Sequence, residues 1–160
     1  MLIDSSPHRR LRRMWAFYFV LAIMASAGAS GAADDLAPAS QQLIRPEELA
    51  RAIKAAEKPV ILYVGPKFFY TQAHVPGAEY LGPAARPEGL EKLRARAASL
   101  AKDRPVVIYC GCCPWDHCPN IQPAWAELKK AGFSKVRVLY LATSFGADWK
   151  EKGYPVAVGE

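Results

Sequence analysis

The segment VVIYCGCCPWDHCPN, residues 106–120, begins as a buried strand and ends as a loop rich in sulfur. Its opening residues are apolar, aromatic and β-branched, the composition of a strand covered on both faces. All four cysteines of the chain then lie between Cys110 and Cys118. The segment therefore predicts a buried strand that presents Cys110 at its carboxyl end.

Apolar and amphipathic runs alternate along the rest of the chain. Further strands are predicted at residues 59–64, around 79–81 and at 135–142, and helices at 45–58, 87–102, 122–133 and within 145–156. This alternation predicts an α/β domain whose mainly parallel central sheet, of about five strands, is flanked by helices on both faces. Functional crevices of such sheets lie beyond the carboxyl ends of the strands, so the position of Cys110 favours a functional site over mere packing.

The first 33 residues have the pattern of a secretory signal. An arginine-rich run precedes an apolar run that starts at Met14, and small residues follow. The apolar run is shorter than the ~20 residues of a membrane-spanning helix, so we expect contact with a membrane only if the signal stays uncleaved. We predict a periplasmic or secreted protein, with a flexible tether without regular structure at residues 34–42 and one domain at 43–160.

The net charge gives little support for a nucleic-acid partner. The predicted signal carries four of the 21 basic residues and one of the 15 acidic residues, so the remainder has a net charge near +3. No basic stripe interleaved with aromatic residues appears in the sequence. We therefore expect no nucleic acid as a partner.

Six segments, taken in order, resemble the rhodanese-like domain family: RPEELA, PVILYV, AHVPGAEYL, VVIYC, AELKKAGFSKVRVL and FGADWKEKGYPV. The resemblance extends over residues 44–156 and implies a rhodanese-like fold. It also implies a sulfurtransferase in which Cys110 is the catalytic nucleophile and carries sulfane sulfur as a persulfide. The implied partners are a small sulfur donor and a thiol or cyanide-like acceptor, and no cofactor is expected.

Two departures of the chain from the family pattern bear on its chemistry. The usual DVR at the end of the first core strand is replaced by Tyr63, Val64 and Gly65. The active-site loop is about five residues longer than usual and contains no Lys or Arg. A catalytically silent module that binds a metal or a protein partner through this loop is therefore one alternative function.

The loop cysteines allow further alternatives. A nucleophilic thiolate needs its pKa lowered from about 8.5, and we expect loop amides and the positive end of the following helix to do this for Cys110. Cys110 and Cys113 form a C-x-x-C pair, which is typical of thiol-disulfide oxidoreductases. Cys112, Cys113 and Cys118 are candidates for resolving a persulfide or for bracing the loop by a disulfide.

Metal binding is the remaining alternative for the loop. Its candidate ligands are Cys112, Cys113, His117 and Cys118, whose softness suits Cu(I) better than zinc. His117 is otherwise a possible proton carrier, and Trp115 a possible wall of the pocket. Elsewhere, Lys67 and Arg86 are candidates for attracting an anion at the mouth of the site, although single surface charges usually bind nothing specific. His74 is predicted to be a scaffold residue.

Overall fold

The computed structural model describes residues 38–159. The predicted signal and residues 34–37 of the predicted tether lie outside this range. The prediction of no regular structure is wrong at the end of the tether, where Ser40–Gln42 form a 3-10 helix, η2. The Gln42 side chain accepts a hydrogen bond from the Ala39 backbone N–H at 2.7 Å, which closes this turn. Within residues 38–159, no helix combines the length and apolar character needed to cross a membrane.

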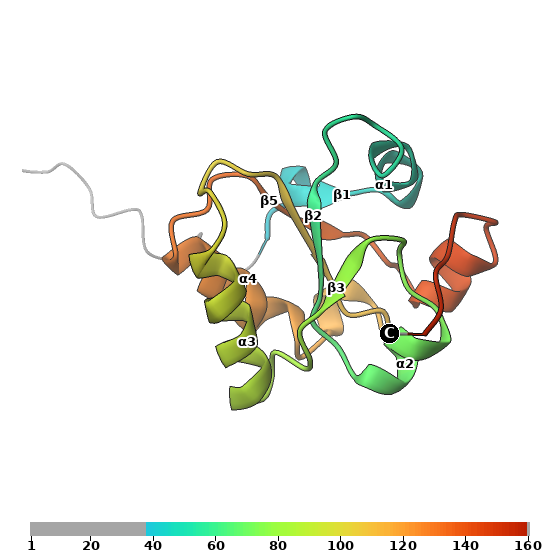
Figure 1. Ribbon diagram of the computed structural model, residues 1–160. Helices are drawn as coiled ribbons and strands as arrows, with labels where there is room; N and C mark the ends of the chain where they lie inside the picture. Colours follow the sequence, from blue (N-terminus) through green and yellow to red (C-terminus); the bar gives the residue numbers. More distant parts are fainter. Residues whose placement is uncertain (1–37, 160) are drawn as a thin grey trace, which may run out of the picture. The chain divides into compact units, whose positions relative to one another are not determined.

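A five-stranded parallel sheet forms the centre of the domain (Figure 1). Its strands are β1 (Leu43–Ile44), β2 (Val60–Tyr63), β3 (Ala78–Tyr80), β4 (Val106–Tyr109) and β5 (Val136–Leu139), in the order β1-β5-β4-β2-β3. All four pairings are parallel, which confirms the predicted sheet. The sequence did not single out β1, because a strand of two residues is too short to show a periodicity.

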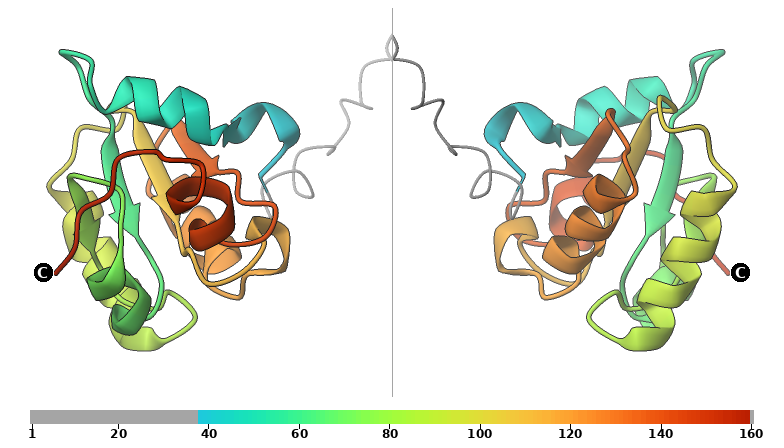
Figure 2. Two further views of the ribbon diagram at one scale, coloured as in Figure 1. Left: turned by 90° about the vertical axis from the view of Figure 1, so that its right-hand side faces the viewer. Right: turned by 90° about the vertical axis from the view of Figure 1, so that its left-hand side faces the viewer.

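Helices cover both faces of the sheet, as Figures 1 and 2 show. They are α1 (Pro46–Ala52), α2 (Lys67–Gln72), α3 (Pro87–Ala98) and α4 (Ile121–Lys130), with a 3-10 helix η3 (Trp115–His117) and a π-helix η4 (Gly146–Lys150). The predicted helix at residues 45–58 ends early, at Ala52. Residues 54–58 contain no large apolar side chain and are exposed, so burial does not stabilise further turns there.

Alternate residues of the strands enter two separate cores. Leu62, Ile108 and Val138 pack with the buried faces of α3 and α4. Ile61, Val107 and Leu139 pack with α1, α2 and η4 on the opposite face. Side chains of a strand alternate between the two faces of the sheet, so Cys110 continues the row of Ile108 and belongs to the core with α3 and α4.

Pairing between β2 and β4 brings the ends of these two strands together. Tyr63 is in register with Tyr109, and the Val64 N–H donates a hydrogen bond to the Tyr109 carbonyl at 2.9 Å. Gly65 follows Val64, and Cys110 follows Tyr109. Both residues therefore lie at the carboxyl edge of the sheet. This is the edge at which the sequence predicted a functional site.

Candidate functional site

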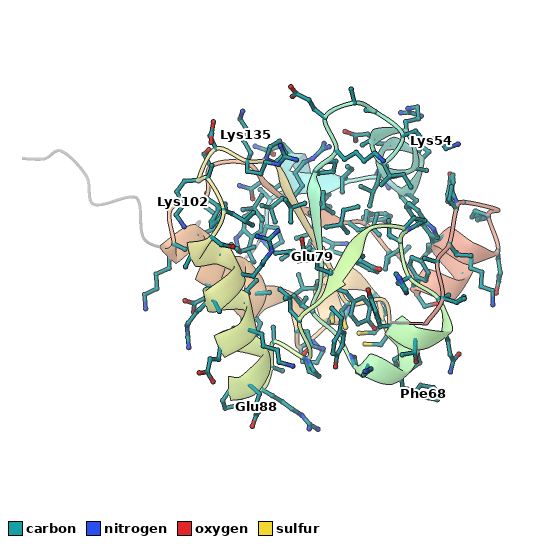
Figure 3. The ribbon with its side chains drawn as sticks, in the orientation of Figure 1. Lys54, Phe68, Glu79, Glu88, Lys102 and Lys135 are labelled. Atoms are coloured by element: carbon teal, nitrogen blue, oxygen red, sulfur yellow. The ribbon has the colours of Figure 1, made fainter. Side chains whose placement is uncertain are left out.

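The four cysteines meet at the carboxyl edge of the sheet, and their sulfur atoms gather in one region of Figure 3. The Cys110 and Cys112 sulfurs are 3.2 Å apart, and those of Cys112 and Cys113 are 3.1 Å apart. The Sγ atoms of Cys110, Cys112 and Cys118, here called the sulfur triad, all lie within 4.8 Å of one another. All four cysteines are free thiols.

Contacts with the segment after β5 fix the path of the loop. Gly111 has a φ of +83°, and a Cβ added there would lie 3.2 Å from the Cβ of Phe145. Its carbonyl accepts the Phe145 N–H at 3.0 Å, and the Trp115 N–H donates to the Leu141 carbonyl at 3.0 Å. The turn at Gly111 places Cys112 beside Cys110, because the chain reverses there without a side chain in the way.

Gly65 leaves the space that Cys110 occupies. A Cβ at Gly65 would lie 2.6 Å from the Cys110 carbonyl oxygen and 2.7 Å from its Sγ. Gly65 stands where the family pattern DVR has its arginine. The sequence showed that glycine replaces this arginine. It did not show that the glycine lets the end of β2 come close to the Cys110 sulfur.

Asn120 is a site residue that the sequence analysis missed. Its side chain is 4% exposed, and its Nδ2 donates to the Sγ of Cys110 at 3.3 Å. Its Oδ1 accepts the Ala85 N–H at 3.0 Å, which fixes the orientation of the amide. An Asn immediately before a helix is typical of a cap, but this side chain makes no capping hydrogen bond. It instead ties Cys110 to the segment before α3.

The electrostatics of the site favour a thiolate on Cys118. Interaction with the nearby Cys110 thiol, together with the backbone N–H groups of Asn120 and Ile121, lowers the pKa of Cys118 to about 5, although burial opposes this. Interaction with Cys118, followed by burial, raises the pKa of Cys110. Burial also raises the pKa of Cys113. The Cys112 backbone N–H does lower the pKa of Cys110, as predicted for a loop amide, but the interaction with Cys118 and burial outweigh it. The backbone N–H groups at the start of α4 act on Cys118 instead.

A pH titration tests this assignment. We expect one thiolate to form near pH 5, since a lowered pKa keeps the sulfur anionic at every pH above it. The ultraviolet absorbance of thiolate measures this directly. In Cys118→Ser the low-pH step should disappear, and the first thiolate should form nearer the ordinary cysteine pKa of about 8.5 or above. An unchanged low-pH step in this variant would contradict the assignment.

The other predicted residues divide between the site and its surroundings. The His117 side chain is 80% exposed, and its Nδ1 lies 2.9 Å from an Asp116 carboxylate oxygen. Trp115 is half-buried and packs against the core of α3 and α4. His74 is buried, and its Nδ1 lies 2.8 Å from the Tyr70 carbonyl, as expected of a scaffold residue.

The predicted metal ligands are only partly brought together. The sulfur triad contains Cys112 and Cys118 of the predicted set, with Cys110 in place of Cys113 and His117. The sequence could not distinguish these sets, because the cysteines are so close along the chain that each combination appeared feasible.

A hollow of about 470 Å³ opens beside Asn120. Lys67 and Arg86, the two candidate cations for the mouth of the site, both line it, together with Asn120. None of the four cysteines, which all lie in the described range, lines the hollow, and Asn120, which contacts Cys110, connects it to the sulfur atoms. Two exposed cations beside a neutral amide favour a small anion there.

Comparisons with known proteins agree with this architecture. Residues 45–145 match the family model of the rhodanese-like domain. The Alr3790 protein from Anabaena is 27% identical, with a TM-score of 0.54, and the match covers 72% of this chain and 92% of that one. The BH2092 protein from Bacillus halodurans is 21% identical, with a TM-score of 0.55 and coverage of 72% and 75%.

A further structural neighbour is SseA from Escherichia coli, which is described among 3-mercaptopyruvate sulfotransferases with a rhodanese fold. It is 19% identical, with a TM-score of 0.53, and the match covers 74% of this chain and 52% of SseA. At this identity the likeness shows the fold alone, and it confirms the fold that the sequence predicted. A comparison with curated proteins finds no match.

Proposed function

The chain belongs to the rhodanese-like domain family, and we propose that it is a sulfurtransferase of the cell envelope that carries sulfane sulfur as a persulfide on Cys110. The main support for this proposal is the position of Cys110. It is the first residue after β4, at the carboxyl edge of the sheet, and its sulfur accepts a hydrogen bond from Asn120. The predicted signal supports the location.

The reaction follows from the contacts of Cys110. Its sulfur lies within 4.8 Å of the Cys118 sulfur, whose lowered pKa suits Cys118 to act as the base. As the Cys110 sulfur attacks the sulfane sulfur of the donor, its proton passes to Cys118. The donor's S–S bond breaks, a new S–S bond forms on Cys110, and the rest of the donor leaves with the electron pair. With thiosulfate, the leaving group is sulfite.

The second half of the reaction returns the site to its starting state. A thiol or cyanide-like acceptor attacks the terminal sulfur of the persulfide, and the Cys110 sulfur leaves as a thiolate that regains its proton from Cys118. The hollow beside Asn120 supports a small anionic donor, because Lys67 and Arg86 both line it. These cations supply the positive charge that the loop itself lacks.

Mass measurement of the intact protein tests the proposal. The metal-free chain is incubated without oxygen with thiosulfate, polysulfide or a thiosulfonate, and then weighed. We expect one added sulfur atom per chain with at least one donor, and its removal by cyanide. Protein alkylated beforehand is the control and should gain no sulfur. Failure of every donor to add sulfur would contradict the proposal.

Thiol-disulfide exchange is a second candidate, favoured by the 3.2 Å separation of the Cys110 and Cys112 sulfurs. The sequence suggested Cys113 as the partner of Cys110, but Cys112 lies between them and contacts both. Redox titration with peptide mapping distinguishes the two functions. A reversible disulfide between Cys110 and Cys112, without any persulfide, would favour exchange over sulfur transfer.

A further inference from the structure

We propose that the sulfur triad of Cys110, Cys112 and Cys118 is a binding site for Cu(I), coordinated by three cysteine sulfurs. The proposed sulfur transfer uses Cys110 as the nucleophile and Cys118 as the base, which leaves the position of the Cys112 sulfur beside them unexplained. A metal site accounts for it, because all three Sγ atoms lie within 4.8 Å of one another. Small movements of these side chains would place them around one ion.

The donor atoms decide which metal the site would take. The sulfur triad contains no nitrogen or oxygen donor, and sets made only of thiolates favour soft ions such as Cu(I). Structural zinc sites are almost always four-coordinate. Cys113 contacts Cys112 but lies outside the triad, and the exposed His117 side chain pairs with Asp116. Three sulfurs therefore suit Cu(I) better than zinc.

The surroundings of the triad match a buried, negatively charged metal site. Cys110 and Cys118 are 2% and 5% exposed, so water is largely kept from two of the three ligands. The Asn120 Nδ2 lies 3.3 Å from the Cys110 sulfur and 4.0 Å from the Cys118 sulfur. This amide offsets part of the charge of the thiolates, as hydrogen bonds to metal ligands commonly do.

The three ligands also come from fixed elements. Cys110 directly follows β4, Cys118 lies just before α4, and the turn at Gly111 sets the position of Cys112. Binding changes no oxidation state: Cu(I) forms bonds to sulfur, and each thiol that becomes a ligand releases its proton to water. Because Cys110 is shared, bound Cu(I) would block persulfide formation at the same sulfur.

The test is a Cu(I) titration of the full-length chain, without oxygen, in competition with a coloured Cu(I) chelator. We expect one Cu(I) per chain and X-ray absorption showing three sulfur neighbours. Loss of a second-shell partner alone costs metal sites about 10- to 100-fold in affinity, so loss of a ligand in Cys112→Ser should cost about 100-fold or more. Cys113→Ser is the matched control, half-buried in the same loop, and should bind as the wild type does.

Four outcomes would overturn the proposal: no binding against the chelator, equal weakening in both variants, a nitrogen neighbour of the copper, or tighter binding of zinc with four sulfurs. Circular dichroism of both variants checks that they fold. Persulfide formation is measured separately on the metal-free protein. Loss of copper binding would therefore leave the proposed sulfur transfer intact, and failure of sulfur transfer would leave the copper site intact.

Discussion

Cys110→Ser is expected to lower the rate of sulfur transfer by about 10³-fold or more, the order of loss seen when an enzyme loses its nucleophile. A serine hydroxyl has nearly the shape of the thiol but forms no persulfide, so both halves of the reaction fail. The rate of thiosulfate consumption with a thiol or cyanide acceptor measures the effect.

Cys113→Ser is the matched control for this variant. Cys113 belongs to the same loop but takes no part in the proposed steps, and we expect its rate to stay within about tenfold of the wild type, less than the loss of a catalytic group usually causes. Similar rates for Cys110→Ser and the wild type would show that another residue carries the sulfur. Melting curves of both variants confirm that a lost rate does not reflect unfolding.

Gly65→Ala is expected to destabilise the domain by about 3 kcal/mol, at the upper end of the cost of overpacking. The added methyl group would lie 2.6 Å from the Cys110 carbonyl oxygen and 2.7 Å from its sulfur, so backbone as well as side chain must move. Displacement of the Cys110 sulfur should also lower the rate of sulfur transfer. Chemical denaturation gives the free energy of unfolding, and the same preparation gives the rate.

Gly146→Ala is the control for Gly65→Ala. A Cβ at Gly146 has its nearest neighbour, the Ser144 Oγ, at 3.6 Å, which is an ordinary contact. We expect a change in the free energy of unfolding within about 1 kcal/mol, as for a glycine replaced where no clash results. Equal stability of the two variants would contradict the close approach of Gly65 to Cys110.

The strands that build the site could be predicted because strands buried on both faces appear in the sequence as continuous apolar runs. The apolar runs that became β2 and β4 showed both strands, and the parallel sheet then placed Cys110 at its carboxyl edge. The C-terminal end of α1 could not be predicted as well, because residues 54–58 have helical propensity without a buried face. Strand β1 gave no signal, since its two residues acquire their strand character from pairing with β5.

The arrangement inside the loop could not be predicted for a different reason. A loop has no periodicity, so the sequence showed four neighbouring cysteines without showing which sulfurs meet. The roles of Gly65 and Asn120 depend on contacts between segments far apart in the chain. The lowered pKa of Cys118 depends on the neighbouring Cys110 and on the backbone N–H groups at the start of α4, so it too follows from the folded loop.

Peptide mapping of the donor-treated protein tests the central claim most directly. The metal-free protein is loaded with a sulfane sulfur donor, its persulfides are trapped with an alkylating agent, and fragmentation in the mass spectrometer locates the added sulfur. We predict that the sulfur resides on Cys110. Its location on Cys118, the more acidic thiol, in protein that retains the native fold would contradict the account.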